Sequence, residues 1–244
     1  MRDLGWAPDQ DPTGKQCGLQ ALYRTNMLRT RAHANIMRSE ASADSLGEVE
    51  LALDLGHIEA GQRQTHVREL EIELISGSPM AVIEAARRLV LEHNLWLDSQ
   101  TKAHRGDQLA KESQLGHSCP QPPARTRTKS AAQDASPQAR WLQAWNTAIE
   151  QVSLNLSEVA LGGDKQAWAH AAATGLRRLR FLSRHQHAAK LTSSWLLQLN
   201  ELLATLRPSH GQEPNVAQIF KLSRAPHTTL WLLDALEMLI KAEA

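Results

Sequence analysis

The segment Val67–Leu74 alternates strictly between acidic and aliphatic side chains from Glu69 onward. In a β-strand, successive side chains point to opposite faces, so Glu69, Glu71 and Glu73 would share one face and the aliphatic residues the other. Carboxylates two residues apart on a strand lie roughly 7 Å apart, and they repel unless water, basic side chains or a divalent cation compensates. The pattern therefore predicts a strand with one aliphatic face and one acidic face that needs compensating charge.

A second segment, residues 49–54, repeats this pattern, with Glu50 and Asp54 alternating with aliphatic residues. The sequence Asp54-Leu55-Gly56 is typical of a turn and predicts the end of that strand. The acidic pattern thus occurs on two expected strands.

A third segment, residues 22–36, would carry basic rather than acidic side chains on one face, namely Arg29, Arg31 and His33. Acid and base would then share one side of a small antiparallel sheet. The periodicity leaves two interpretations open: a binding surface, or a solvated sheet whose aliphatic face packs on a helix.

One helix is expected to cover that aliphatic face. Ser78-Pro79 combines a capping residue with a first-turn proline, and an apolar stripe at helical spacing follows through His93.

After Ser136-Pro137 the chain is expected to be all-α, because apolar residues recur at spacings of three and four almost to its end. The tryptophans of this region are expected to fill its core. The expected helices lie near 137–160, 164–185, 189–206 and 226–242, with a short turn around 216–222.

Between the two regions, residues 112–138 are rich in Gln, Pro, Ser and Ala. They show neither the helical spacing of apolar residues nor the alternation of a strand. This stretch exceeds the roughly 12 to 15 residues of a loop within a compact domain, so it is predicted to be a linker.

The 244 residues carry a formal net charge of only +1, which argues against a protein dominated by nonspecific nucleic-acid binding. A specific nucleic-acid partner is not expected either. No apolar run approaches the about 18 residues that a membrane-spanning helix needs, and the amino terminus shows no signal-peptide pattern. We therefore expect a cytoplasmic chain without a membrane partner.

One predicted helix is strongly cationic. His170, Arg177 and Arg184 repeat every seven residues and share one stripe, and Arg178 and Arg180 add to the charge. A solvated exterior and an anion-binding surface both fit this pattern.

Three motifs in order resemble the later half of CYTH domains, which belong to the triphosphate tunnel metalloenzymes and in bacterial inorganic triphosphatases precede a CHAD domain. The resemblance covers about residues 19–112. The motifs are Glu48–Ile58, Arg68–Gly77 and Lys102–Gly106.

This resemblance implies an antiparallel barrel whose acids hold Mg²⁺ or Mn²⁺ and whose basic residues hold inorganic triphosphate. Such a pairing is chemically coherent, because hard cations take oxygen ligands and bridge phosphate oxygens. By position it implies metal ligands at Glu69, Glu71 and Glu73, further tunnel acids at Glu50 and Asp54, and substrate-binding residues at Arg29, Lys102 and Arg105.

The cationic helix resembles the signature helix of CHAD domains over about residues 140–244, roughly the first half of such a domain. His170, Arg177, Arg178 and Arg180 match the signature, whereas Ala173 stands at its first Arg position. The resemblance implies a helical bundle that binds polyphosphate through these four matching residues.

Together these features predict an α+β chain: a partial triphosphate-tunnel-like half-barrel with a covering helix, followed by an all-α CHAD-like bundle. Open sheet edges would permit self-association. The predicted organisation is an irregular leader at 1–18, a partial CYTH-like domain at 19–112, a linker at 113–136 and a partial CHAD-like domain at 137–244.

The opening Glu-x-Glu-x-Lys strand of the CYTH family, which supplies principal metal ligands, has no counterpart in this sequence. This departure leaves three interpretations open: the gene is truncated, the missing strands come from another chain, or the fragment has abandoned catalysis. Three functions stay open: a metal-dependent triphosphatase, a non-catalytic polyphosphate-binding protein, and a generic helical interaction module.

Overall fold

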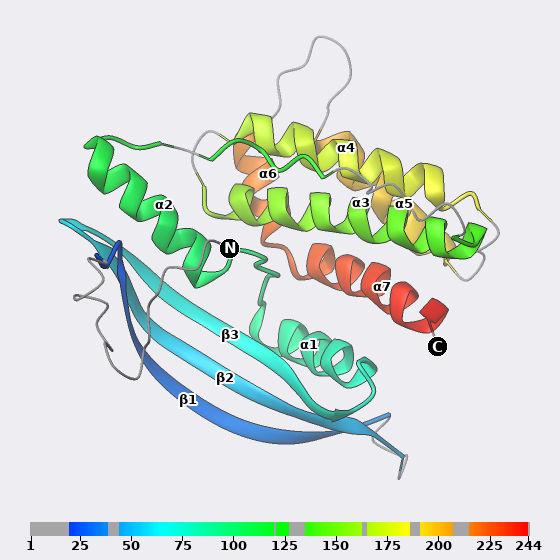
Figure 1. Cartoon of the computed structure of the whole chain (residues 1–244). Coiled ribbons are helices and arrows are strands. Elements are labelled where there is room, and N and C mark those ends of the chain that lie inside the picture. The colour runs from blue at the N-terminus through cyan, green and yellow to red at the C-terminus, as the bar shows by residue number, and fades with distance from the viewer. Residues whose placement is uncertain are drawn as a thin grey trace. The chain divides into compact units, whose positions relative to one another are not determined.

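The computed structural model describes residues 20–38, 44–119, 121–126, 135–162, 165–185, 191–206 and 215–243. These residues form an α+β fold in which strands come first and helices follow, as predicted (Figure 1). The expected leader at 1–18 lies outside the described residues. The elements are β1 (Arg24–Met37), β2 (Ser45–Ala60), β3 (Arg63–Gly77), α1 (Met80–His93), α2 (Lys102–Leu115), α3 (Pro137–Ala160), α4 (Gln166–Leu182), α5 (Ser193–Leu206), α6 (Val216–Ser223) and α7 (Pro226–Glu243).

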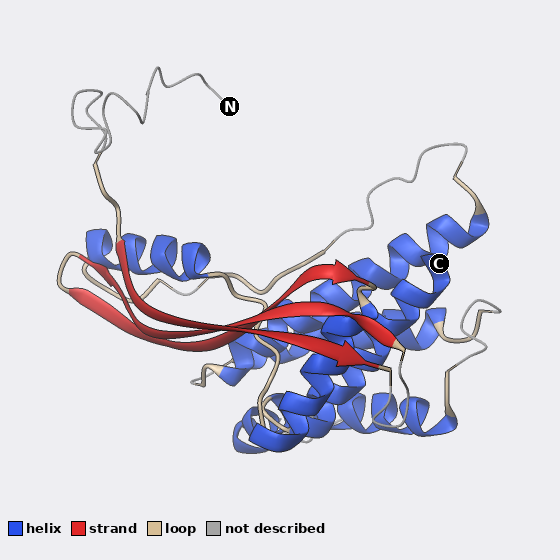
Figure 2. Cartoon of the chain, turned by 90° about the horizontal axis from the view of Figure 1, so that it is seen from below, coloured by secondary structure: helices blue, strands red, loops and turns tan. Residues whose placement is uncertain are grey.

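The strands form one antiparallel sheet in the order β1-β2-β3. Figure 2 shows the three strands lying side by side. Over the described part of the chain no further strand joins the sheet, and it does not close into a barrel.

The turn predicted at Asp54-Leu55-Gly56 is wrong, because β2 continues through it to Ala60. Gly56 instead permits a close approach to β1: a Cβ at this position would lie 2.0 Å from the carbonyl oxygen of Asn26. Glycine within a strand often marks such a contact between backbones.

Contacts between Cα atoms group the chain into two compact units, and each unit contains part of all three strands. Unit 1 comprises Met1–Thr30, Leu53–Leu70 and Thr101–Gln121, and unit 2 comprises Arg31–Ala52, Glu71–Gln100 and Pro122–Ala244.

The core of unit 1 lies between α2 and the sheet. Leu109 and Ala110 of α2 are buried with Ile58, Ala60 and Val67. Gly106 lets the helix approach the ring of Tyr23, to which an added Cβ would come within 2.4 Å. The sequence patterns predicted no helix here, because α2 has a weak apolar stripe.

In unit 2, α1 covers the aliphatic face of the sheet, as predicted. Ala81 and Ala85 pack against Ile36 and Val49. The helix begins at Met80, whose N–H donates to the Ser78 hydroxyl at 3.2 Å.

The larger core of unit 2 is helical and joins α3, α4, α5, α6 and α7. Figure 1 shows α3 and α4 side by side, and Ser136 caps α3 by accepting from the Ala139 N–H at 3.1 Å. All four long helices expected here are present, and the expected short turn is the helix α6.

The predicted role of the tryptophans as core residues is confirmed by a stacked column of four indole rings. Trp141 stacks on Trp145 at 5.0 Å between centroids, Trp145 on Trp195 at 5.7 Å, and Trp195 on Trp231 at 4.7 Å. All four side chains are buried.

Part of the expected linker is fixed to α3. The buried amide of Asn155 donates to the Ala124 carbonyl at 2.9 Å and accepts from the Ala124 N–H at 3.0 Å. The Thr126 hydroxyl donates to the Thr147 carbonyl at 2.8 Å. Residues 122–126 are therefore part of unit 2.

Candidate functional site

A cluster of charged side chains lies in unit 1, around the carboxylate of Asp54. This side chain is 1% exposed. Arg29 binds it with two hydrogen bonds, from Nε to Oδ1 at 2.7 Å and from Nη2 to Oδ2 at 2.6 Å. The Nζ of Lys102 lies 2.7 Å from Oδ2. Three elements, β1, β2 and α2, thus converge on one buried acid.

The start of α2 brings its cations to this point. Thr101 caps the helix by accepting from the His104 N–H at 3.1 Å, which fixes Lys102 at the first helical position. Arg105 follows one turn later on the same side of the helix. Thr101, a residue type favoured at helix N-caps, and Gly116 at the C-cap are sequence signals that could have indicated this helix.

Glu69 on β3 is the second acid of the cluster. It forms an ion pair with Lys102, and its Oε2 lies 3.1 Å from Nη1 of Arg105. Lys102 therefore bridges Asp54 and Glu69. We call Arg29, Asp54, Glu69, Lys102 and Arg105 the charged cluster.

The acids of this region are spaced for a shared cation. Carboxylate oxygens of Asp54 and Glu69 lie within 4.8 Å of each other, while Glu71, the next acid along β3, belongs to unit 2. Two oxygens that bind one Mg²⁺, Mn²⁺ or Ca²⁺ at about 2.0 to 2.6 Å lie no more than about 5 Å apart, so this separation fits a divalent cation. Glu73, the third acid of the alternating run, is exposed and does not belong to this group.

The hydrogen bonds from Arg29 hold the pKa of Asp54 well below its usual range, and Lys102 acts in the same direction. Burial alone would raise this pKa, but the paired cations outweigh it. Asp54 is therefore ionised at every pH at which most proteins fold.

The polar face of the sheet carries further ion pairs in unit 2. Glu50 lies 3.6 Å from Arg31 and 3.5 Å from His33, which also lies 3.4 Å from Glu48. The alternation predicted that Arg31 and His33 would face these acids, but no site role was assigned to them or to Glu48. The signal for Glu48 was its spacing of two from Glu50.

The cationic residues of α4 lie in unit 2. His170, Arg177 and Arg180 are exposed, and Arg177 donates to the Thr174 hydroxyl at 2.8 Å. Arg178 instead donates to the Thr126 carbonyl at 2.9 Å and to the Gln151 side chain at 2.7 Å. Arg178 is therefore exposed like Arg177 and Arg180, but it differs from them in binding Thr126 of the segment 122–126.

None of the helices in the described ranges combines the length and apolarity that crossing a membrane requires. A comparison with models of known protein families gives no match for this chain.

Proposed function

We propose that this chain binds a condensed inorganic phosphate, such as triphosphate, together with Mg²⁺ or Mn²⁺ at the charged cluster. The observation that carries the proposal is the convergence of three cations on closely spaced carboxylates, one of which is almost fully buried. A buried carboxylate without a partner is costly, so the buried Asp54 requires nearby cations such as Arg29 and Lys102.

A metal–triphosphate complex could replace the existing ion pairs of the charged cluster. Lys102 would move from carboxylate to phosphate oxygens, and the acids would keep their compensation through the cation. Each charge then retains a partner of opposite sign, so the exchange leaves no charge buried alone. Hard divalent cations accept carboxylate and phosphate oxygens together.

The sheet and the helices also support a proposal about the families to which the two parts of the chain are related. The three-stranded sheet with acids and bases on one face supports a triphosphate-tunnel-like half-barrel, and the helices of unit 2 support a relationship to CHAD domains. Binding rather than hydrolysis is the primary proposal, because the sequence has no Glu-x-Glu-x-Lys strand to complete the metal site.

Isothermal titration calorimetry with triphosphate and MgCl₂ tests the proposal. Wild type should bind, and Glu69→Gln should weaken binding at least about tenfold, since it removes a charge-assisted contact. The control is Glu73→Gln, an exposed acid of the same strand outside the cluster, which should bind like wild type. Equal affinity in both variants, with circular dichroism showing that both are folded, would refute the cluster as the site.

Phosphate release in the same samples distinguishes a triphosphatase from a binding protein. Release that requires Mg²⁺ or Mn²⁺ and is lost in Glu69→Gln would assign catalysis to the cluster. Binding without release would leave a non-catalytic phosphate-binding protein.

Long-chain polyphosphate binding by α4 is a second candidate, favoured by its exposed cations. In the parts of the chain that the structure describes, Arg177 and Arg180 form no ion pair with a carboxylate. An anionic polymer would relieve the repulsion between these like charges.

Retention on a polyphosphate matrix tests this second candidate. Replacing Arg177 and Arg180 by Gln should reduce both the retention and its salt dependence, because fewer counterions are released on binding. The single variant Arg38→Gln, at an exposed arginine just after β1, serves as the control. Unchanged retention of the double variant would exclude α4 as the polyphosphate site.

A further inference from the structure

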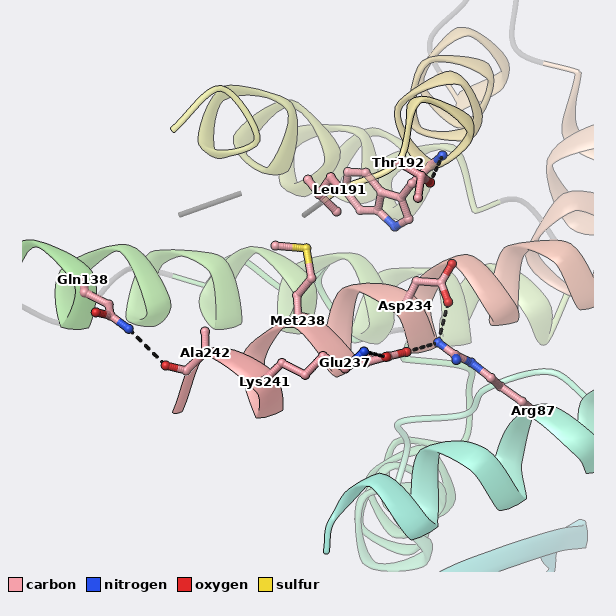
Figure 3. A pocket seen from close by; sticks show the side chains of 10 residues that line it. Arg87, Gln138, Leu191, Thr192, Asp234, Glu237, Met238, Lys241 and Ala242 are labelled. Atoms are coloured by element: carbon pink, nitrogen blue, oxygen red, sulfur yellow. Dashed lines mark hydrogen bonds and ion pairs between the residues drawn. The ribbon is translucent and has the colours of Figure 1, made fainter. Parts of the chain in front are cut away.

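A cavity of about 510 Å³ lies within unit 2, and none of its lining residues belongs to the charged cluster. Figure 3 shows side chains from α7 on one side of it, with Leu191 and Thr192 opposite. Its volume falls within the range of about 300 to 1,000 Å³ that is typical of small-molecule sites. The cavity is therefore large enough for a small organic ligand.

One wall of the cavity is apolar. Leu191, Met238 and the indole of Trp195 contribute to it. Trp195 is only 3% exposed and is held by stacking on both sides, so this wall is rigid. An apolar ligand body placed here would be removed from water.

The other wall is charged, and its two carboxylates differ in their number of cationic partners. Glu237 has two cationic partners, Arg87 at 2.5 Å and Lys241. Asp234 shares Arg87 with it, through Oδ1 at 2.5 Å. The second oxygen of Asp234 accepts no hydrogen bond from any described residue.

The electrostatics of the two acids differ accordingly. Burial alone would raise the pKa of Glu237, but the hydrogen bonds from Lys241 and Arg87 outweigh it and lower that pKa. Burial raises the pKa of Asp234, and Glu237 adds to this, while Arg87 compensates only in part. Asp234 is thus the acid for which an additional positive charge would be most favourable.

We propose that this cavity binds a small organic cation, an amine with an apolar body, whose ammonium group pairs with Asp234 and whose body contacts Leu191 and Met238. An anionic ligand would face two carboxylates, while both cations of the cavity are already paired. A neutral apolar ligand would cover Asp234 without compensating it, which costs free energy.

This inference is independent of the proposed phosphate site, because no residue of the charged cluster lines the cavity. Failure of one proposal therefore leaves the other intact.

Calorimetry with three probes that share one apolar body tests the inference: 2-phenylethylamine, 2-phenylethanol and phenylacetate. Wild type should bind the amine most tightly, and the carboxylate should not bind. Asp234→Asn should weaken amine binding about tenfold, since it removes a charge-assisted contact, and should not weaken binding of the alcohol. The control is Glu150→Gln, an exposed acid of α3 outside the cavity, which should bind like wild type.

A second variant locates the ligand by filling the cavity. Ala242→Phe, near the end of α7, should abolish binding of the amine while circular dichroism shows a folded protein. No saturable amine binding to wild type, equal affinity for amine and alcohol, or an Asp234→Asn variant that binds the amine normally would each overturn the proposal.

Discussion

At the scale of single residues, two aspartates show how differently a carboxylate can be compensated. Asp54 has two cationic partners and a lowered pKa, whereas Asp234 shares one and has a raised pKa. The alternation around Asp54 predicted its face of the sheet. It did not predict Lys102 as its partner, because that contact depends on the position of α2, which has no strong periodicity in the sequence.

The two aspartates are expected to respond to substitution with opposite signs. A lowered pKa in the folded state contributes stability above the unfolded pKa of about 4, and this contribution is lost as the pH falls below that value. Asp54→Asn should therefore reduce the free energy of unfolding at pH 7 by about 3 kcal/mol, because it breaks a buried ion pair. The difference from wild type should shrink as the pH falls below about 4.

Asp234→Asn is the matched comparison, and urea unfolding at pH 7 and pH 3 measures both variants. A raised pKa means that the ionised form is disfavoured in the folded protein, so this substitution should not lower stability at pH 7. The assignment would be wrong if Asp54→Asn unfolded like wild type at pH 7.

At the scale of secondary-structure elements, a close contact between α3 and α4 is set by a glycine. A Cβ on Gly175 of α4 would lie 2.7 Å from Cγ2 of Val152 and 3.0 Å from the carbonyl oxygen of Ala148. Gly175→Ala should therefore destabilise the protein by about 1 to 3 kcal/mol, although alanine is the better helix former by about 1 kcal/mol. The adjacent variant Thr174→Ala, which adds no atoms, is the control in the same unfolding measurement. A Gly175→Ala protein more stable than wild type would contradict this packing.

Sequence patterns predicted elements well where a local signal and a strong period coincide, as at Ser136-Pro137 and the start of α3. They were wrong at Gly56. A glycine that permits a close contact between strands cannot be distinguished in the sequence from a glycine that forms a turn. The partners of Arg178 were also beyond prediction, because the carbonyl that it binds lies 52 residues away in the chain. Contacts of this kind depend on tertiary packing rather than on local propensity.

At the scale of the whole molecule, the described sheet has two edges without a neighbouring strand, one on β1 and one on β3. Long open edges pair readily with other strands. On β1, Leu28 is 70% exposed. We therefore expect concentration-dependent self-association, with Leu28→Lys reducing it because a charged residue on an edge strand opposes pairing.

Sedimentation velocity over a range of concentrations measures this association. Leu197→Lys is the matched control, since Leu197 is 64% exposed but lies on α5 and not on the sheet. Identical behaviour of both variants would exclude the β1 edge as the contact.

The stacked column of Trp141, Trp145, Trp195 and Trp231 has an optical consequence. The transition dipoles of indoles at centroid separations of 4.7 to 5.7 Å are close enough to couple. Near-ultraviolet circular dichroism should therefore show exciton bands, and any loosening of the helical core would erase them before helix content falls.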